Sequence, residues 1–440
     1  MRKIMFFVCL ISLLAGCKDD GEPTLDDISL GQVTVNLSGL EGNMPDFDIM
    51  LRNTQTGSIF MAKSDETGKA SFTTTPGIYE ASATGHYADE GMAYSYNGVA
   101  GQIAVRRGET VNVTITMKGI VRSQVIIKEL YNGGCLADDG TTKYQFDKYV
   151  ILYNNSSQPA SLSNLCLGFL TPYNAQSTNN NYDAEGRLTY EAGDFTPVLD
   201  GIWYFPSTLV IEPYEQVVVN IHGAIDNSQS YSQSVNFANP DYYCMYDPES
   251  GYINPKYYPT PSGLIPSSHY LKAFRWSQSN AWPLSVTSPA LLLFQTQGMS
   301  PAEYASQVDN IWYDGGEVKQ TKQCLKIPNQ WIVDAIEVFS SGYKDSSVKR
   351  LTADIDAGYV WLTNYQGHSL YRNVDQAATE ALPENEGKIV YNYSLGGDGS
   401  TDSSGIDAEA SIRNSAHIVY QDTNNSTNDF HERPKCSLRK

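Results

Sequence analysis

Basic residues are scarce in this chain, which has 30 Lys and Arg residues against 49 Asp and Glu and a formal net charge of −19. A protein with this excess of negative charge is repelled by phosphate backbones, so nucleic-acid binding is not expected. Long apolar runs are missing beyond position 17, so we expect the rest of the chain to lie outside the bilayer. Tyrosine, at 30 residues, outnumbers phenylalanine and tryptophan together, and with the frequent glycine this suits a secreted, β-rich protein.

Cysteine and histidine are too few and too scattered to indicate a metal or redox site. Beyond position 17 the cysteines are Cys135, Cys166, Cys244, Cys324 and Cys436. No two of them form a CxxC motif, and because their number is odd, at least one stays free unless it pairs between molecules. Cys166 lies in an apolar run, and we expect it to be a small buried hydrophobe. The 6 His residues form no HxH or HExxH motif, so we predict no metal and no cofactor.

The first residues of the chain form a short export signal. Arg2 and Lys3 precede an apolar run, residues 4–14, that is too short to span a bilayer and ends in small residues. The sequence Leu-Ala-Gly-Cys that closes the signal resembles the lipobox of bacterial lipoproteins. This resemblance implies that residues 1–16 are removed and that the thiol of Cys17 is acylated. The alternative is a plain secretory signal with an incidental cysteine.

Residues 17–27 form an acidic tether that suggests where the protein is displayed. Lys18, Asp19 and Asp20, which follow Cys17, resemble the start of the lipoprotein export signal of Bacteroidota. That resemblance implies display on the outer face of the outer membrane, because such signals are addresses read by receptors. The alternative is a solvated tether without an address, on a lipoprotein that faces the periplasm.

Residues 28–119 are expected to form a first β domain. Several runs alternate apolar and polar residues between turn residues, which predicts half-buried antiparallel strands. These runs are residues 32–37, 49–51, 103–105 and 111–115. Between them, residues 65–72 (Asp-Glu-Thr-Gly-Lys-Ala-Ser-Phe) and 76–79 (Pro-Gly-Ile-Tyr) are turns that lead into strands. These two motifs resemble carboxypeptidase-regulatory-like and transthyretin-like domains, which implies a seven-strand β-sandwich that acts as a spacer or docking module.

The remainder, residues 120–440, continues with strands separated by polar turns. The clearest predicted strands are residues 125–131, 147–153 and 162–167. Together with Val-Asp-Ala-Ile at 333–336 and Asp-Thr-Asn-Asn-Ser at 422–426, they resemble the lamin-tail domain, an immunoglobulin-like sandwich. Such a sandwich has roughly a hundred residues. The resemblance therefore implies a larger lamin-tail-like β-sandwich with long loop insertions, and the predicted fold class of the whole chain is all-β.

Two aromatic groups supply the candidate binding residues. The Tyr-rich stretch 231–261 has no clean strand or helix period, so we predict a long loop inserted between sandwich strands. Tyrosines on such a loop suit protein or sugar contact, and an equally weighted alternative is that they pack on the sheet and cover an edge. Two tryptophans close by lie among cationic residues and suggest an anionic ligand, although core packing is the commoner role of tryptophan. The candidates are Tyr242, Tyr243, Tyr246, Tyr252, Tyr257, Tyr258, Trp276 and Trp282.

Support for catalysis is weak. The sequence has no GxSxG motif. Asp334 and Glu337 are a tempting carboxylate pair, but on a strand their spacing sends them to opposite faces. On a helix they would share a face, yet the lamin-tail resemblance favours a strand. We therefore predict no catalytic residues and a protein that is not an enzyme.

Taken whole, the chain is similar to a family of uncharacterised Bacteroides lipoproteins with a domain of unknown function. That resemblance implies an accessory or ligand-capture partner of a TonB-dependent β-barrel transporter in the outer membrane. We therefore predict a lipid-anchored, cell-surface protein that acts by binding. The alternative is a stand-alone adhesin for a glycan or a protein, and a surface hydrolase is less favoured still.

Overall fold

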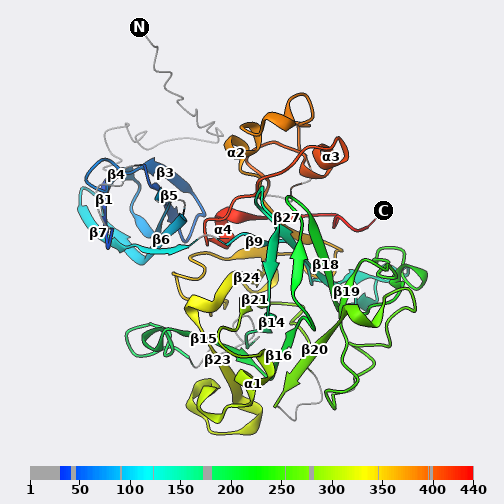
Figure 1. Cartoon of the computed structure of the whole chain (residues 1–440). Coiled ribbons are helices and arrows are strands. Elements are labelled where there is room, and N and C mark those ends of the chain that lie inside the picture. Colours follow the sequence, from blue (N-terminus) through cyan, green and yellow to red (C-terminus); the bar gives the residue numbers. More distant parts are fainter. Residues whose placement is uncertain are drawn as a thin grey trace.

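The computed structural model describes residues 30–40, 46–89, 92–121, 123–171, 181–252, 254–276, 282–344, 346–394, 396 and 400–439. The expected lipidation and export residues, Cys17, Lys18, Asp19 and Asp20, lie outside the described residues. What is described consists mostly of β-strands with a few short helices, so the all-β prediction is confirmed. Figure 1 shows a smaller domain in blue and cyan beside a larger one that runs from green to red.

The first domain is a sandwich of two sheets. In one, β1 (Gly31–Ser38) lies between β4 (Lys69–Thr74) and β7 (Thr110–Thr116). The other has the order β3 (Ile59–Lys63), β2 (Asp48–Asn53), β5 (Gly77–Asp89), β6 (Met92–Val105) and β8 (Lys118–Val121). The described residues thus hold eight strands rather than the expected seven, because β8 lies at the expected domain boundary and pairs with β6.

Alternation of side chains builds the core of this sandwich. Along β1, Val33 and Val35 are fully buried while the residues between them are more exposed. Ile49 and Leu51 on β2 face them from the other sheet, and Tyr79 on β5 joins the same apolar cluster. A period of two with one buried face is what a sandwich of two packed sheets requires. The outer face of the five-stranded sheet is therefore left for other contacts.

One long mixed sheet organises the second domain. Its order is β25 (Val360–Leu362), β24 (Ile332–Ser340), β21 (Ala290–Gln295), β14 (Leu165–Phe169), β16 (Gly201–Tyr204), β20 (Tyr270–Arg275), β19 (Tyr243–Met245), β18 (Gln216–His222), β12 (Lys148–Asn154), β9 (Val125–Tyr131), β26 (Ser369–Arg372) and β27 (Phe430–Arg433). Strands from both halves of this sheet contribute to one apolar cluster, so the sheet bends around it. All residues of β9 and β12 are buried, because further clusters cover the other face of the sheet.

Smaller elements cover the rest of this domain. Short sheets pair β10 (Cys135–Leu136) with β11 (Lys143–Tyr144), β13 (Ala160–Leu162) with β17 (Leu209–Ile211), and β15 (Phe195–Leu199) with β23 (Gln323–Pro328) and β22 (Ile311–Tyr313). The helices are α1 (Pro301–Ser306), α2 (Gln376–Glu380), α3 (Ala408–Arg413) and α4 (Ser426–Asp429). A side-chain oxygen at each N-cap accepts a backbone N–H, which fixes where these short helices begin. No helix in the described part of the chain is long and apolar enough to cross a membrane.

Candidate functional site

The Tyr-rich stretch is only partly the loop that the sequence predicted. Within it, Tyr243–Met245 form strand β19, which lies in the middle of the long sheet and runs parallel to β18 and to β20. The predicted long loop is therefore interrupted by one short strand. A strand of three residues is too short to display a period, so the pattern along the chain could not reveal it.

The tyrosines of this stretch pack onto the sheet. Tyr258 is 7% exposed, and its hydroxyl donates to the carbonyl of Trp282 at 2.6 Å. Trp282 stacks on Trp203 at 5.0 Å between ring centroids. The remaining candidates are half-buried against apolar clusters of the second domain: Tyr242, Tyr243, Tyr246, Tyr252, Tyr257 and Trp276. Two roles were considered for these aromatic residues: contact with a protein or sugar, and packing on the sheet to cover it. The observed packing matches the second role.

The cations near these aromatics have partners within the chain. The Lys272 amine lies 2.7 Å from a carboxylate oxygen of Glu249. The Arg275 guanidinium lies over the ring of Tyr252, 4.1 Å from its centroid. A cation that is already paired within the chain attracts an external anion less strongly. The arrangement therefore stabilises the loop more directly than it presents an anion site.

Asp334 and Glu337 are engaged on opposite faces of β24, as the strand prediction required. Asp334 contacts the guanidinium of Arg372, and Glu337 accepts from the Arg350 side chain at 2.9 Å. Both pairs are buried, and burial raises the pKa of Asp334. These carboxylates hold two buried arginines in place and do not share a site.

The cysteines behave as apolar core residues. All of those in the described residues are free and buried, and Cys166 belongs to an apolar cluster as predicted. Burial raises the pKa of Cys135, of Cys244 and of Cys436 to about 12, so these thiols stay protonated at neutral pH. Among the described residues, no three His, Cys, Asp or Glu side chains are grouped to hold a metal ion.

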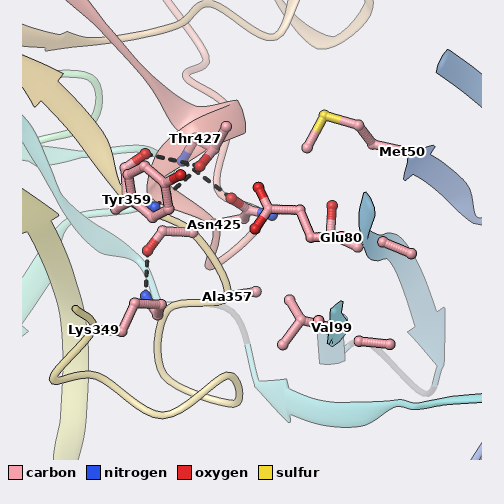
Figure 2. Close-up of a pocket in the computed structure, with 13 residues that line it drawn as sticks. Met50, Glu80, Val99, Lys349, Ala357, Tyr359, Asn425 and Thr427 are labelled. Carbon is pink, nitrogen blue, oxygen red and sulfur yellow. Dashed lines mark hydrogen bonds between the residues drawn. The ribbon is translucent and has the colours of Figure 1, made fainter. Parts of the chain in front are cut away.

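A pocket lies in the seam between the two domains. It has a volume of about 120 Å³ and is walled on one side by the five-stranded sheet of the first domain. The opposite wall comes from the second domain, as Figure 2 shows. The lining is mostly apolar and includes Met50, Val99 and Ala357. Because Val99 is 41% exposed, the pocket opens to solvent.

The second-domain wall is held together by Asp356. Its carboxylate accepts the backbone N–H of Gly358 at 2.9 Å and that of Ser426 at 2.7 Å. The hydroxyl of Thr427 then donates to the carbonyl of Tyr359 at 2.8 Å, so two chain segments far apart in sequence form one surface. Gly358 is needed at this point, because a Cβ there would lie 1.9 Å from Oδ1 of Asn425. The wall is therefore built by specific local contacts.

The first-domain wall is a row of side chains on the outer face of the sheet. Met50 on β2 is the register partner of Ser82 on β5, and Ser82 is the partner of Val99 on β6. Their neighbours Ala81 and Ala83 point to the core of the sandwich, as alternation along the strand demands. The wall thus uses the face that the sandwich core leaves free.

Two polar side chains that line the pocket have unused hydrogen-bonding capacity. Ser82 is 8% exposed, and its hydroxyl makes no hydrogen bond within the described residues. Asn425 is 1% exposed; its Oδ1 accepts from the Thr427 N–H at 3.1 Å, while its Nδ2 finds no acceptor among the described residues. A polar group that lines a pocket and has hydrogen-bonding capacity left over is able to bond a ligand there.

One arginine links the domains beside the pocket. Nη1 of Arg52 donates to the hydroxyl of Tyr359 at 3.1 Å, and the guanidinium lies 5.9 Å from the centre of that ring. Arg52 also lies 3.6 Å from the carboxylate of Glu80. Burial, and then the charge of Glu80, raise the pKa of Tyr359, so its hydroxyl stays neutral at neutral pH.

Sequence reasoning did not find this pocket. Its two walls come from segments some three hundred positions apart, and no motif marks either of them. The sequence held only an indirect signal. Met50 and Val99 are apolar residues that point outward from strands whose inward-pointing residues are already apolar. An apolar residue on the solvent face of a strand indicates a contact of some kind but does not identify it.

Comparisons with known proteins agree with the fold. Residues 212–394 match the model of a family described as a protein of unknown function (DUF4876). A crystal structure of a DUF4876 family protein from Bacteroides thetaiotaomicron VPI-5482 is similar, with a TM-score of 0.51 and 21% identity; the match covers 91% of this chain and 94% of that chain. A search of curated proteins found no match. The predicted similarity to a family with a domain of unknown function is therefore confirmed, and the match to the DUF4876 model extends over residues 212–394.

Proposed function

We propose that this chain is an exported, lipid-anchored protein that acts by binding, and that the seam pocket is its binding site. The observation that carries the proposal is the pocket itself, which is walled by both domains, is mostly apolar, and is lined by two polar side chains with unused hydrogen-bonding capacity. Apolar concavities with a few convergent polar groups, often at domain interfaces, are the usual form of binding sites. The lipobox-like sequence before Cys17 supports the anchor.

The partner we favour is a TonB-dependent transporter of the outer membrane, for which this protein is an accessory or ligand-capture subunit. The acidic residues after Cys17 support display at the cell surface. In this proposal the first domain, which resembles carboxypeptidase-regulatory-like sandwiches, is the docking module above the lipid. The second, lamin-tail-like domain supplies the other wall of the site.

Cross-linking on intact cells tests this proposal. The tagged, lipidated protein is cross-linked and purified, with Cys17→Ala as the unanchored control. We expect one outer-membrane transporter to be recovered in near-equal amount with the anchored protein and not with the control. Recovery of the lipoprotein alone would reject a stable transporter complex and leave the stand-alone adhesin as the better account.

A further inference from the structure

The pocket continues into an exposed apolar row on the first domain. Met61 on β3 is the register partner of Met50, so Met61, Met50, Ser82 and Val99 form one line across four adjacent strands. Directly opposed residues on neighbouring strands have their Cβ atoms about 5 Å apart. Met61 is 61% exposed, and the line therefore leads from open solvent into the pocket.

This row carries little net charge although the chain as a whole is strongly acidic. On one side of it Lys63 lies 3.1 Å from Asp48, and on the other Arg52 lies 3.6 Å from Glu80. Each flank is thus a neutralised pair. A partner that lies along the row meets apolar side chains between two closed ion pairs, which favours an uncharged segment over an acidic or a basic one.

The apolar surface extends beyond the pocket as far as the edge of the sheet. β3 is the outermost strand of its sheet, and Ile59 on it is 54% exposed, next to Met61 on the same face. A small molecule that fills the pocket would leave this surface uncovered. An extended polypeptide would cover it and would still place one side chain in the pocket, as an anchor residue does at a protein interface.

We propose that the seam pocket receives one apolar side chain from an uncharged, extended segment of a partner polypeptide, with Ser82 and Asn425 bonding the amide group beside that side chain. The inference rests on the proposed binding function and names its partner class. A cavity of about 150 Å³ holds a benzene-sized molecule, so the volume of about 120 Å³ suits one aliphatic side chain. A peptide amide supplies both an acceptor and a donor, which complements the unused amide N–H of Asn425 and the hydroxyl of Ser82. A sugar would set most of its hydroxyls against apolar walls.

Capped tripeptides test the chemistry of the pocket directly. The full chain carrying Cys17→Ala is titrated with acetyl-Ala-Leu-Ala-amide and with acetyl-Ala-Asp-Ala-amide, followed by NMR. We expect binding of the leucine peptide alone. Val99→Trp, which fills the pocket mouth, is expected to weaken that binding by roughly tenfold or more. The matched control Val210→Trp, at an exposed valine on a strand of another sheet, leaves binding unchanged.

Ser82→Ala separates recognition from folding. Because this hydroxyl has no partner within the described residues, its removal leaves the melting temperature unchanged and weakens peptide binding by about fivefold, the value of one hydrogen bond. Absence of leucine-peptide binding, or equal binding by Val99→Trp, overturns the inference. Neither result bears on the cross-linking experiment above. If a transporter is recovered by cross-linking but the leucine peptide does not bind, the pocket chemistry is rejected and the binding function is kept.

Discussion

The packing of Tyr258 allows a quantitative test of whether the Tyr-rich stretch covers the sheet. The centroid of its ring lies 5.2 Å from that of Trp203 and 5.7 Å from that of Tyr252, and the two tyrosine rings are arranged in a T shape. With only 7% of its surface exposed, Tyr258 is a core residue of the second domain. Replacing a buried aromatic by alanine costs about 3–5 kcal/mol, from the lost transfer energy and the cavity left behind. We therefore expect Tyr258→Ala to lower the free energy of unfolding of this domain by that amount.

Tyr258→Phe isolates the hydroxyl. That group donates to the carbonyl of Trp282 at 2.6 Å, and its loss leaves a buried acceptor without this donor. The expected cost is about 1–3 kcal/mol. Tyr343, which is 43% exposed, supplies the matched control, and Tyr343→Ala is expected to stay within about 0.5 kcal/mol of the parent.

Urea unfolding followed by tryptophan fluorescence measures all of these variants. Trp203 and Trp282 lie against Tyr258, so their emission reports the unfolding of this region. A loss below about 1 kcal/mol for Tyr258→Ala, similar to that of Tyr343→Ala, would refute the covering role. The stretch would then be loosely attached, and its tyrosines would return as candidates for binding a partner.

Three further predictions concern ion pairs, pH and the seam. Arg350→Met leaves the buried carboxylate of Glu337 without its cation and is expected to cost about 3–5 kcal/mol in urea unfolding; Lys63→Met, which breaks an exposed pair, costs below about 1 kcal/mol. Burial lowers the pKa of His431 from 6.5 to about 3, so the unfolded chain takes up a proton between these values that the folded chain does not, and stability falls as the pH falls. His431→Gln is therefore expected to reduce the slope of unfolding free energy against pH by up to about 1.4 kcal/mol per pH unit between pH 6 and pH 4. An unchanged slope would contradict the lowered pKa of His431. Arg52→Met removes the hydrogen bond across the seam and is expected to broaden the interdomain distance distribution measured by fluorescence energy transfer, with the melting temperature within a few degrees of the parent.

Whether a strand could be predicted from the sequence depended on how its residues are buried. In the first domain, Val33 and Val35 are buried while their neighbours are more exposed, so the period was visible and this strand was predicted. In the second domain the run Val125–Tyr131 is buried on both faces, and the apolar residues on either side of Lys128 and Glu129 still marked a strand. The strand Tyr243–Met245 escaped notice because it is held by its neighbours in the sheet and shows no pattern of its own.

The seam pocket lay beyond sequence reasoning for a different reason. Met50 and Asn425 line one pocket only because the two domains pack together, and nothing local in either segment encodes that packing. The unused hydrogen-bonding capacity of Ser82 likewise depends on the assembled surface. A serine on a strand does not indicate a binding site until its surroundings are known.

Site-specific photo-cross-linking on intact cells tests most directly whether this protein holds a partner at the seam. Met61→benzoylphenylalanine places the reactive group on the exposed row beside the pocket, and Val210→benzoylphenylalanine places it at a comparably exposed strand position of the second domain. The account predicts a cross-linked polypeptide partner from position 61, none from position 210, and loss of the product when Val99→Trp fills the pocket. Equal cross-linking from both positions, or a product that survives Val99→Trp, would contradict it.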